Sequence, residues 1–278
     1  MVYRHILTCF FFLALIPLSA KAFPPASPAG GNYLVLDGVD DYAVLDFKTQ
    51  GVFFPKDTDE FTVEMWVYPT TPPDTNTFAM ILSQQMRICI EEDIHAGDLI
   101  FKIQAHLPIA KGRATTPYPP IPFTLNQWYH IVYQAKGIQT IIIVNDSVDI
   151  SARGTTLAHD ISGFERPKDF TLGGFGKKIQ FRGDYFWGPF AGYIDEVRIS
   201  KVARYGVNKR GFTPRGKFKK DRQTVALWHF DEPGGKRIFS DASDNAYHLI
   251  GEGGAKTGIP LAVEPHEKLT TTWGRLKQ

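Results

Sequence analysis

The chain has few cysteines, little net charge and only one long apolar run. Two cysteines in 278 residues are too few for a disulfide framework or a cluster of thiolate metal ligands. The 31 Lys and Arg residues nearly balance the 29 Asp and Glu residues, which argues against a nucleic-acid-binding protein that works through bulk positive charge. Signatures of zinc hydrolases and serine hydrolases are missing as well, since neither His-Glu-x-x-His nor Gly-x-Ser-x-Gly occurs.

The one apolar run lies at the N-terminus. Ile6 to Leu18 follows the polar pair Arg4-His5 and is shorter than the roughly 20 residues of a membrane-spanning helix. Ala20-Lys21-Ala22 fits the small-x-small pattern of a cleavage site. We therefore expect residues 1–22 to be a secretory signal peptide, and the mature protein to be secreted without a membrane span. The single cysteine that would remain, Cys89, is expected to be a small buried residue.

Short segments of alternating polarity dominate the rest of the chain. In residues 61–67, Phe61, Val63, Met65 and Val67 fall on one face of a predicted strand. Residues 140–144 and 148–151 flank Asn-Asp-Ser, a hairpin signal. Many short strands separated by Gly and Pro predict an all-β fold, an antiparallel β-sandwich or jelly roll.

Composition divides the mature chain into three parts. Residues 23–205 carry nearly all the predicted strands. Residues 206–223 form a basic linker. Two interpretations of its charge stay open: a solvated surface, or a site that binds polyanions. Residues 224–278 form a short tail, which either adds a strand to the sandwich or packs as an appendage.

Four segments stand out in order along the chain: Tyr33–Tyr42 with Asp-Gly-Val-Asp-Asp, Phe61–Pro69, Asn126–Val132 and Gly192–Ile199. Together they resemble the LamG-like jelly-roll domains of the concanavalin A-like lectin/glucanase superfamily. The resemblance implies a concanavalin A-like jelly roll. The segment Ala226–Glu232 resembles the start of such a domain, although here it comes last.

Acidic residues in two of these segments suggest a structural Ca²⁺, which prefers six to eight oxygen ligands. The resemblance implies that Asp195 on the closing strand ligates the ion. With it we expect Asp37, Gly38 through its carbonyl group, and Asp41, so that the ion would tie the first and last strands together. The alternative is that Asp37 and Asp41 only cap a turn.

The set of acids that glucanases of this superfamily need for catalysis is incomplete in this sequence. Those enzymes carry three acids on one strand, and the nearest pattern here, Glu91-Glu92-Asp93, has no third acid after it. We therefore expect no enzyme activity. A glycoside hydrolase or lyase of this fold stays the alternative.

Aromatic side chains on loops or outward strand positions suggest a carbohydrate-binding surface. The predicted ligand-binding residues are Trp66, Tyr68, Tyr185 and Trp187. The alternative is burial of these aromatics between or beneath the sheets. The sequence thus predicts a non-catalytic binding module for glycans or extracellular proteins, while a purely structural adhesion component remains open.

Overall fold

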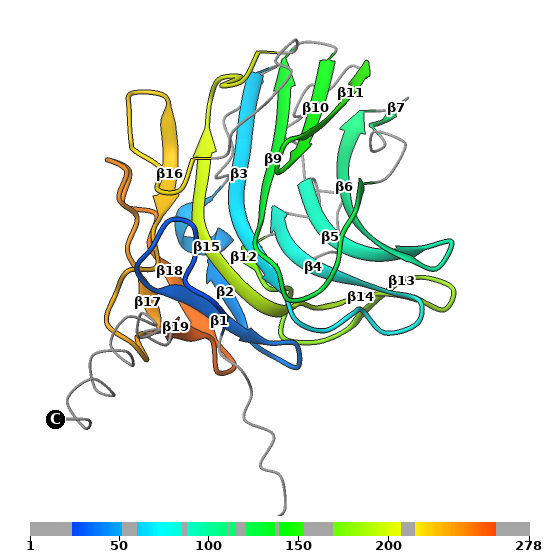
Figure 1. Ribbon diagram of the computed structural model, residues 1–278, viewed down its shortest axis with the longest axis horizontal. Coiled ribbons are helices and arrows are strands. Elements are labelled where there is room, and N and C mark those ends of the chain that lie inside the picture. The colour runs from blue at the N-terminus through cyan, green and yellow to red at the C-terminus, as the bar shows by residue number, and fades with distance from the viewer. Residues whose placement is uncertain are drawn as a thin grey trace, which may run out of the picture.

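A computed structural model describes residues 24–51, 60–84, 88–109, 112–114, 121–136, 139–152, 169–206 and 215–259. These residues form two β-sheets packed face to face and one short helix, α1 (Phe47–Gln50), as Figure 1 shows. The strands pair antiparallel apart from β14 and β4, which run parallel. The expected all-β sandwich is confirmed.

The first sheet has eight strands, with the long strands β3 and β15 at its centre. Its order is β11–β10–β9–β3–β15–β1–β19, and β16 pairs with the end of β15. The bounds are β1 (Tyr33–Asp37), β3 (Glu60–Pro69), β9 (Tyr129–Lys136), β10 (Gln139–Val144), β11 (Ser147–Ala152), β15 (Ala191–Ser200), β16 (Thr224–Trp228) and β19 (Lys256–Gly258).

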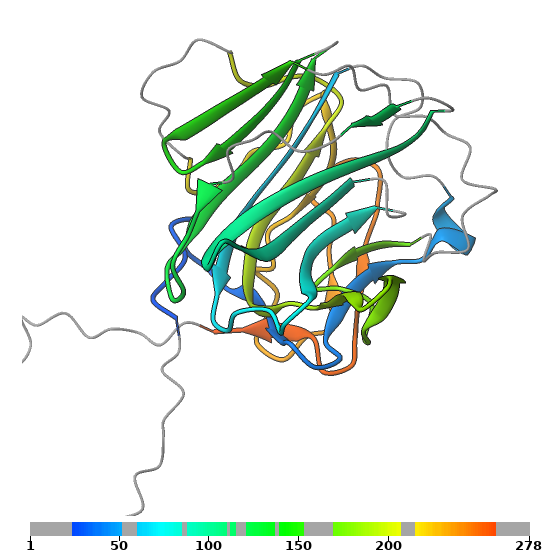
Figure 2. The same cartoon turned by 90° about the vertical axis from the view of Figure 1, so that its right-hand side faces the viewer.

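The second sheet has eleven strands in the order β17–β18–β2–β12–β4–β5–β6–β7, with β14, β13 and β8 attached at its sides. Figure 2 shows this sheet from a second direction. The bounds are β2 (Tyr42–Leu45), β4 (Thr77–Gln84), β5 (Ile88–His95), β6 (Asp98–Ile109), β7 (Gly112–Ala114), β8 (Ile121–Pro122), β12 (Phe170–Leu172), β13 (Ile179–Arg182), β14 (Tyr185–Pro189), β17 (Ile238–Phe239) and β18 (Leu249–Glu252).

The main hydrophobic core lies between the sheets and follows the alternation of the strands. On β3, Phe61, Val63, Met65 and Val67 all face this core. The residues between them point to the outer face of the first sheet, because successive strand residues point to opposite sides. That outer face is also buried, so β3 has almost no exposed residue. Cys89 is buried as expected, on the outer side of the second sheet.

Residues 224–259 take part in both sheets. Strand β16 pairs with β15 and β19 pairs with β1 in the first sheet, while β18 pairs with β2 in the second. Trp228 of β16 is buried and its ring stacks on Phe170 of β12 at 5.2 Å. These contacts make residues 224–259, the described part of the tail, a part of the sandwich and not an appendage.

The described parts of the connection from β15 to β16 lie against the outer face of the first sheet. The hydroxyl group of Thr62 donates to the carbonyl oxygen of Val202. Phe218 is buried against Trp66 and Leu227. Where the structure describes it, at residues 215–223, the predicted basic linker therefore packs over this face of the sheet. We call these residues the cover. No helix among the described residues is long and apolar enough to cross a membrane.

Candidate functional site

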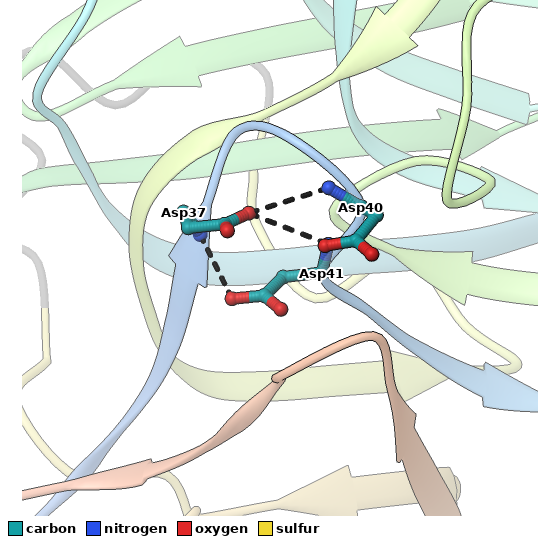
Figure 3. Close-up of side chains that lie close together, drawn as sticks. All are labelled: Asp37, Asp40 and Asp41. Carbon is teal, nitrogen blue, oxygen red and sulfur yellow. Dashed lines mark hydrogen bonds between the residues drawn. The ribbon is translucent and has the colours of Figure 1, made fainter.

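The turn between β1 and β2 gathers three carboxylates, Asp37, Asp40 and Asp41, as Figure 3 shows. One oxygen of Asp37 accepts the backbone N–H groups of Val39 at 2.8 Å and of Asp40 and Asp41 at 3.4 Å. Asp41 accepts the N–H of Asp37 at 3.0 Å and, through its other oxygen, the N–H of Gly254. Two of the acids thus stabilise the turn and attach it to the tail.

The same three carboxylates have the donor chemistry of a calcium site. Their ligand oxygens lie within 4.8 Å of one another, and no ion pair joins them to a basic side chain among the described residues. Burial is the largest cause that raises the pKa of Asp41, and the charges of Asp37 and Asp40 add to it. A cation at this turn would relieve that repulsion.

Asp195 does not join these acids. Strand β1 pairs with β15 so that Asp37 lies opposite Ala191, and Asp195 is four residues further along β15. Four residues of strand span roughly 13 Å, whereas two oxygen ligands of one calcium ion lie at most about 5 Å apart. The structure therefore does not bring Asp195 to the turn where Asp37, Gly38 and Asp41 lie, although β1 and β15 do lie side by side.

Asp195 sits instead at a bulge on the outer face of the first sheet. One oxygen accepts the N–H of Glu196, whose φ of 51° marks the irregularity. Burial holds the pKa of Asp195 well above its usual range, although the hydroxyl group of Ser27 opposes the shift. Glu196 accepts the N–H of Phe218 and contacts His229 Nδ1 at 2.6 Å, which fixes the cover at this bulge.

The four predicted ligand-binding aromatics lie on opposite sheets and do not form one site. Trp66 and Tyr68 are buried on the outer face of the first sheet. The indole N–H of Trp66 donates to the carbonyl oxygens of Arg215 and Gly216, at 3.0 and 3.1 Å. Trp187, on β14 of the second sheet, is only 2% exposed and belongs to a small apolar cluster there.

Tyr185 is the exposed member of the predicted four. The residue is 47% exposed, and its ring stacks nearly parallel to that of Phe78 of β4, with the ring centres 6.0 Å apart. Strand β14 lies beside β4 in parallel register, which brings the two rings together. The pair forms an aromatic platform on the outer side of the second sheet.

Charged groups border this platform. The Lys102 ammonium group lies 4.0 Å from the centre of the Phe78 ring. It also lies 3.6 Å from the carboxylate of Glu91 and 3.3 Å from that of Asp93. Glu91 and Asp93 are alternate residues of β5, so their side chains point to the same side of the sheet. The Glu91-Glu92-Asp93 run was the sequence signal for the acids of this arrangement. The position of Lys102 beside them depends on the register of β6 with β5, which places Lys102 opposite Glu91.

Glu92 points the other way, into the sandwich. It lies opposite Ala79 and Phe101, both core residues. Neither carboxylate oxygen has a hydrogen-bond partner among the described residues, and burial holds the pKa of Glu92 well above its usual range. The three consecutive acids therefore never share one side of the sheet.

Sequence reasoning missed a buried ionic group under the cover. Arg198 of β15 donates to the fully buried carboxylate of Glu64, which also accepts from the hydroxyl group of Tyr205. His130 Nε2 lies 3.7 Å from the same carboxylate. The outward positions of Glu64 and Arg198 were readable from strand alternation. Their pairing depends on the β3–β15 register, which a single sequence does not contain.

A family model described as the concanavalin A-like lectin/glucanases superfamily matches residues 37–205, more than half of the chain. No curated protein sequence matches the chain significantly. Among solved structures, a candidate carbohydrate-binding protein from Bacteroides ovatus is similar, with a TM-score of 0.54 at 17% identity. The match covers 84% of this chain and 61% of that one, so this chain spans about three fifths of its length.

Two further structures show weaker similarity. A heptameric pentraxin from Limulus polyphemus has a TM-score of 0.48 at 12% identity, over 83% of this chain and 96% of that one. Domains LG4-5 of the mouse laminin α1 chain have a TM-score of 0.41 at 13% identity, over 69% and 48% respectively.

Proposed function

Since the chain belongs to the concanavalin A-like lectin/glucanases superfamily, we propose that it is a secreted, non-catalytic glycan-binding protein. Its binding surface is the outer face of the second sheet around Tyr185. Secretion rests on the leader pattern of residues 1–22. The alternative partner is an extracellular protein, and the experiment below separates the two.

The exposed ring of Tyr185 is the observation that carries the proposal. An aromatic residue that is 47% exposed, backed by the parallel ring of Phe78, offers a flat apolar face. The C–H face of a sugar ring packs on such a surface, while nearby charged groups fix its orientation through the hydroxyls. Lys102 and Asp93 are partly exposed and stand beside the platform.

The position of the acids supports binding without hydrolysis. Retaining hydrolysis needs one carboxylic acid that donates a proton and one carboxylate about 5–5.5 Å away. Here the Lys102 ammonium group forms ion pairs with both acids, at 3.6 Å from Glu91 and 3.3 Å from Asp93. Glu92, the third acid of the run, faces the core.

Hydrolysis remains the second candidate function because Glu91 and Asp93 do share one face of β5. Incubation of the protein with polysaccharides that it binds, followed by a reducing-end assay, decides the matter. We expect no release of reducing ends. Release that Glu91→Gln abolishes, with glycan binding unchanged, would establish the hydrolase instead.

We further propose that Ca²⁺ binds at the β1–β2 turn. Asp37, Asp40 and Asp41 would hold it, with the carbonyl group of Gly38. The bound ion supplies positive charge that offsets three carboxylates. Because Asp41 also accepts from Gly254, that charge would strengthen the attachment of the tail to the turn.

A glycan array, read with and without Ca²⁺, tests the proposed function. We expect a narrow set of glycans to bind the intact chain. Binding should persist after chelation, because the turn and the Tyr185 platform are separate sites. An array with no specific binding under either condition would exclude glycans and leave the protein-binding alternative.

A further inference from the structure

Four aromatic side chains gather on the outer face of the first sheet, opposite the glycan surface. They come from four neighbouring stretches of this sheet: Tyr33 on β1, Tyr193 on β15, Tyr68 on β3 and Trp128 directly before β9. Ring centres lie 5.0 Å apart for Tyr33 and Tyr193, 5.7 Å for Tyr68 and Tyr193, 5.3 Å for Tyr68 and Trp128, and 6.1 Å for Tyr33 and Trp128. We call these four residues the aromatic set.

A proline-rich segment of the same chain reaches this set. Residues 24–28 read Pro-Pro-Ala-Ser-Pro, and we call them the strap. The indole N–H of Trp128 donates to the carbonyl oxygen of Pro25 at 2.9 Å. The C-terminal end of the strap packs against the cover. The two backbones approach so closely there that a Cβ atom on Gly216 would lie 2.4 Å from the carbonyl oxygen of Pro28.

The burial of the strap repeats every three residues. Pro24 and Ser27 are buried, whereas Pro25, Ala26 and Pro28 are exposed. Three residues per turn is the period of the polyproline II helix, whose backbone carbonyls make no internal hydrogen bonds. Recognition of such helices uses aromatic side chains that pack on prolines, and here an indole N–H reaches a free carbonyl.

We propose that the aromatic set is a recognition surface for proline-rich extended segments, occupied by the strap and open to a proline-rich segment of another protein. The strap is a weak occupant, because three of its five residues face water. The hydroxyl group of Tyr33 is buried without a hydrogen-bond partner among the described residues, so one donor of the set is unused. A tethered segment still competes well, because its effective concentration is high.

The experiment uses a synthetic peptide with the sequence of residues 24–31, PPASPAGG, and a matched peptide in which alanine replaces the three prolines. In the full chain, Pro24→Gly with Pro25→Gly loosens the strap and empties the aromatic set. We expect this variant to bind the proline peptide at least tenfold more tightly than the intact chain does. The alanine peptide should bind at least tenfold more weakly than the proline peptide.

A substitution of Trp128 provides the second part of the experiment. In the loosened chain, Trp128→Phe keeps an aromatic ring but removes the N–H donor, and we expect about a tenfold loss of peptide affinity, or about 1.4 kcal/mol. The same change on the other sheet, Trp187→Phe, should leave peptide binding unchanged. Circular dichroism confirms that each variant is folded.

Three outcomes overturn the proposal: a folded, loosened chain that binds neither peptide, equal binding of both peptides, or no effect of Trp128→Phe. If loosening the strap prevents folding, the intact chain supplies the test by NMR at millimolar peptide. The Trp128 indole N–H signal, assigned by its loss in Trp128→Phe, should then shift with the proline peptide and not with the alanine peptide. A signal that ignores both peptides overturns the proposal as well. Glycan binding at Tyr185 is independent of every outcome.

Discussion

Arg198 lies directly opposite Glu64 across the pair of β15 and β3, and its Nε donates to that buried carboxylate at 2.8 Å, while Nη2 lies 2.6 Å from the same oxygen. Both side chains are almost inaccessible beneath residues 215–222. A buried ion pair of this kind does more to fix the arrangement of its neighbours than to add net stability. It orders the outer face of the first sheet, where the cover packs.

Removing one partner of this pair should be costly. Arg198→Met leaves the Glu64 charge buried without its guanidinium group, so we predict a loss of about 3–5 kcal/mol of unfolding free energy, measured by urea denaturation. The double variant Glu64→Met with Arg198→Met removes both charges and should recover most of that loss. Additive destabilisation in the double variant would show that the pair is not energetically coupled.

Protonation of Glu64 in acid should lower the free energy of unfolding. Burial opposes ionisation of Glu64, but the nearby His130, the charge of Arg198 and the hydroxyl group of Tyr205 together lower its pKa below its usual value of 4.5. Its contribution is therefore complete above about pH 4.5, where the unfolded chain is ionised, and disappears as the pH falls through the folded pKa. Urea titrations between pH 3 and 6 should show a smaller acid loss in Glu64→Gln than in the wild type.

Glu92 should have the opposite effect. Its folded pKa lies well above 4.5 because of burial, so its favourable contribution is complete below about pH 4.5 and is lost as the pH rises toward the folded pKa. Glu92→Met removes a buried group without a hydrogen-bond partner and should stabilise the protein at pH 7 by about 1–3 kcal/mol. Glu60→Gln, at a partly exposed ion pair, is the control and should change stability little. Destabilisation by Glu92→Met at pH 7 would contradict this account of the core.

Calcium should stabilise the fold through the β1–β2 turn. We predict that excess Ca²⁺ raises the melting temperature and that chelation reverses the effect. Asp40→Asn should abolish the response, because Asp40 is exposed and its carboxylate accepts none of the hydrogen bonds that hold the turn. Asp195→Asn should retain it. A response lost in Asp195→Asn and kept in Asp40→Asn would place the ion at the β15 bulge instead.

Strand alternation and turn composition were enough to predict the sandwich. The pattern of Phe61, Val63, Met65 and Val67 identifies the core face of β3 because burial of one face requires a period of two. The same reasoning did not show that the outer face of β3 is covered too. That burial depends on where residues 215–222 return to the sheet, over a separation of about 150 residues.

The candidate site was less accessible to sequence reasoning because sites depend on register and on the choice of sheet. Asp37 and Asp195 belong to paired strands, but the register sets them four residues apart. Trp66 lies within a family segment and Tyr185 lies shortly before another, yet the two residues are on different sheets. Tyr185 alone of the predicted aromatics is exposed, a property that neither spacing nor composition encodes.

Titration of Tyr185→Ala with the glycan that binds best on the array tests the central claim most directly. Loss of the exposed ring should weaken binding at least tenfold by calorimetry, with the melting temperature almost unchanged because the residue lies at the surface. Ile238→Ala removes an exposed apolar side chain on β17, an edge strand of the same sheet, and serves as the control, with wild-type affinity expected. Wild-type affinity in Tyr185→Ala would contradict the assignment of this face as the glycan surface.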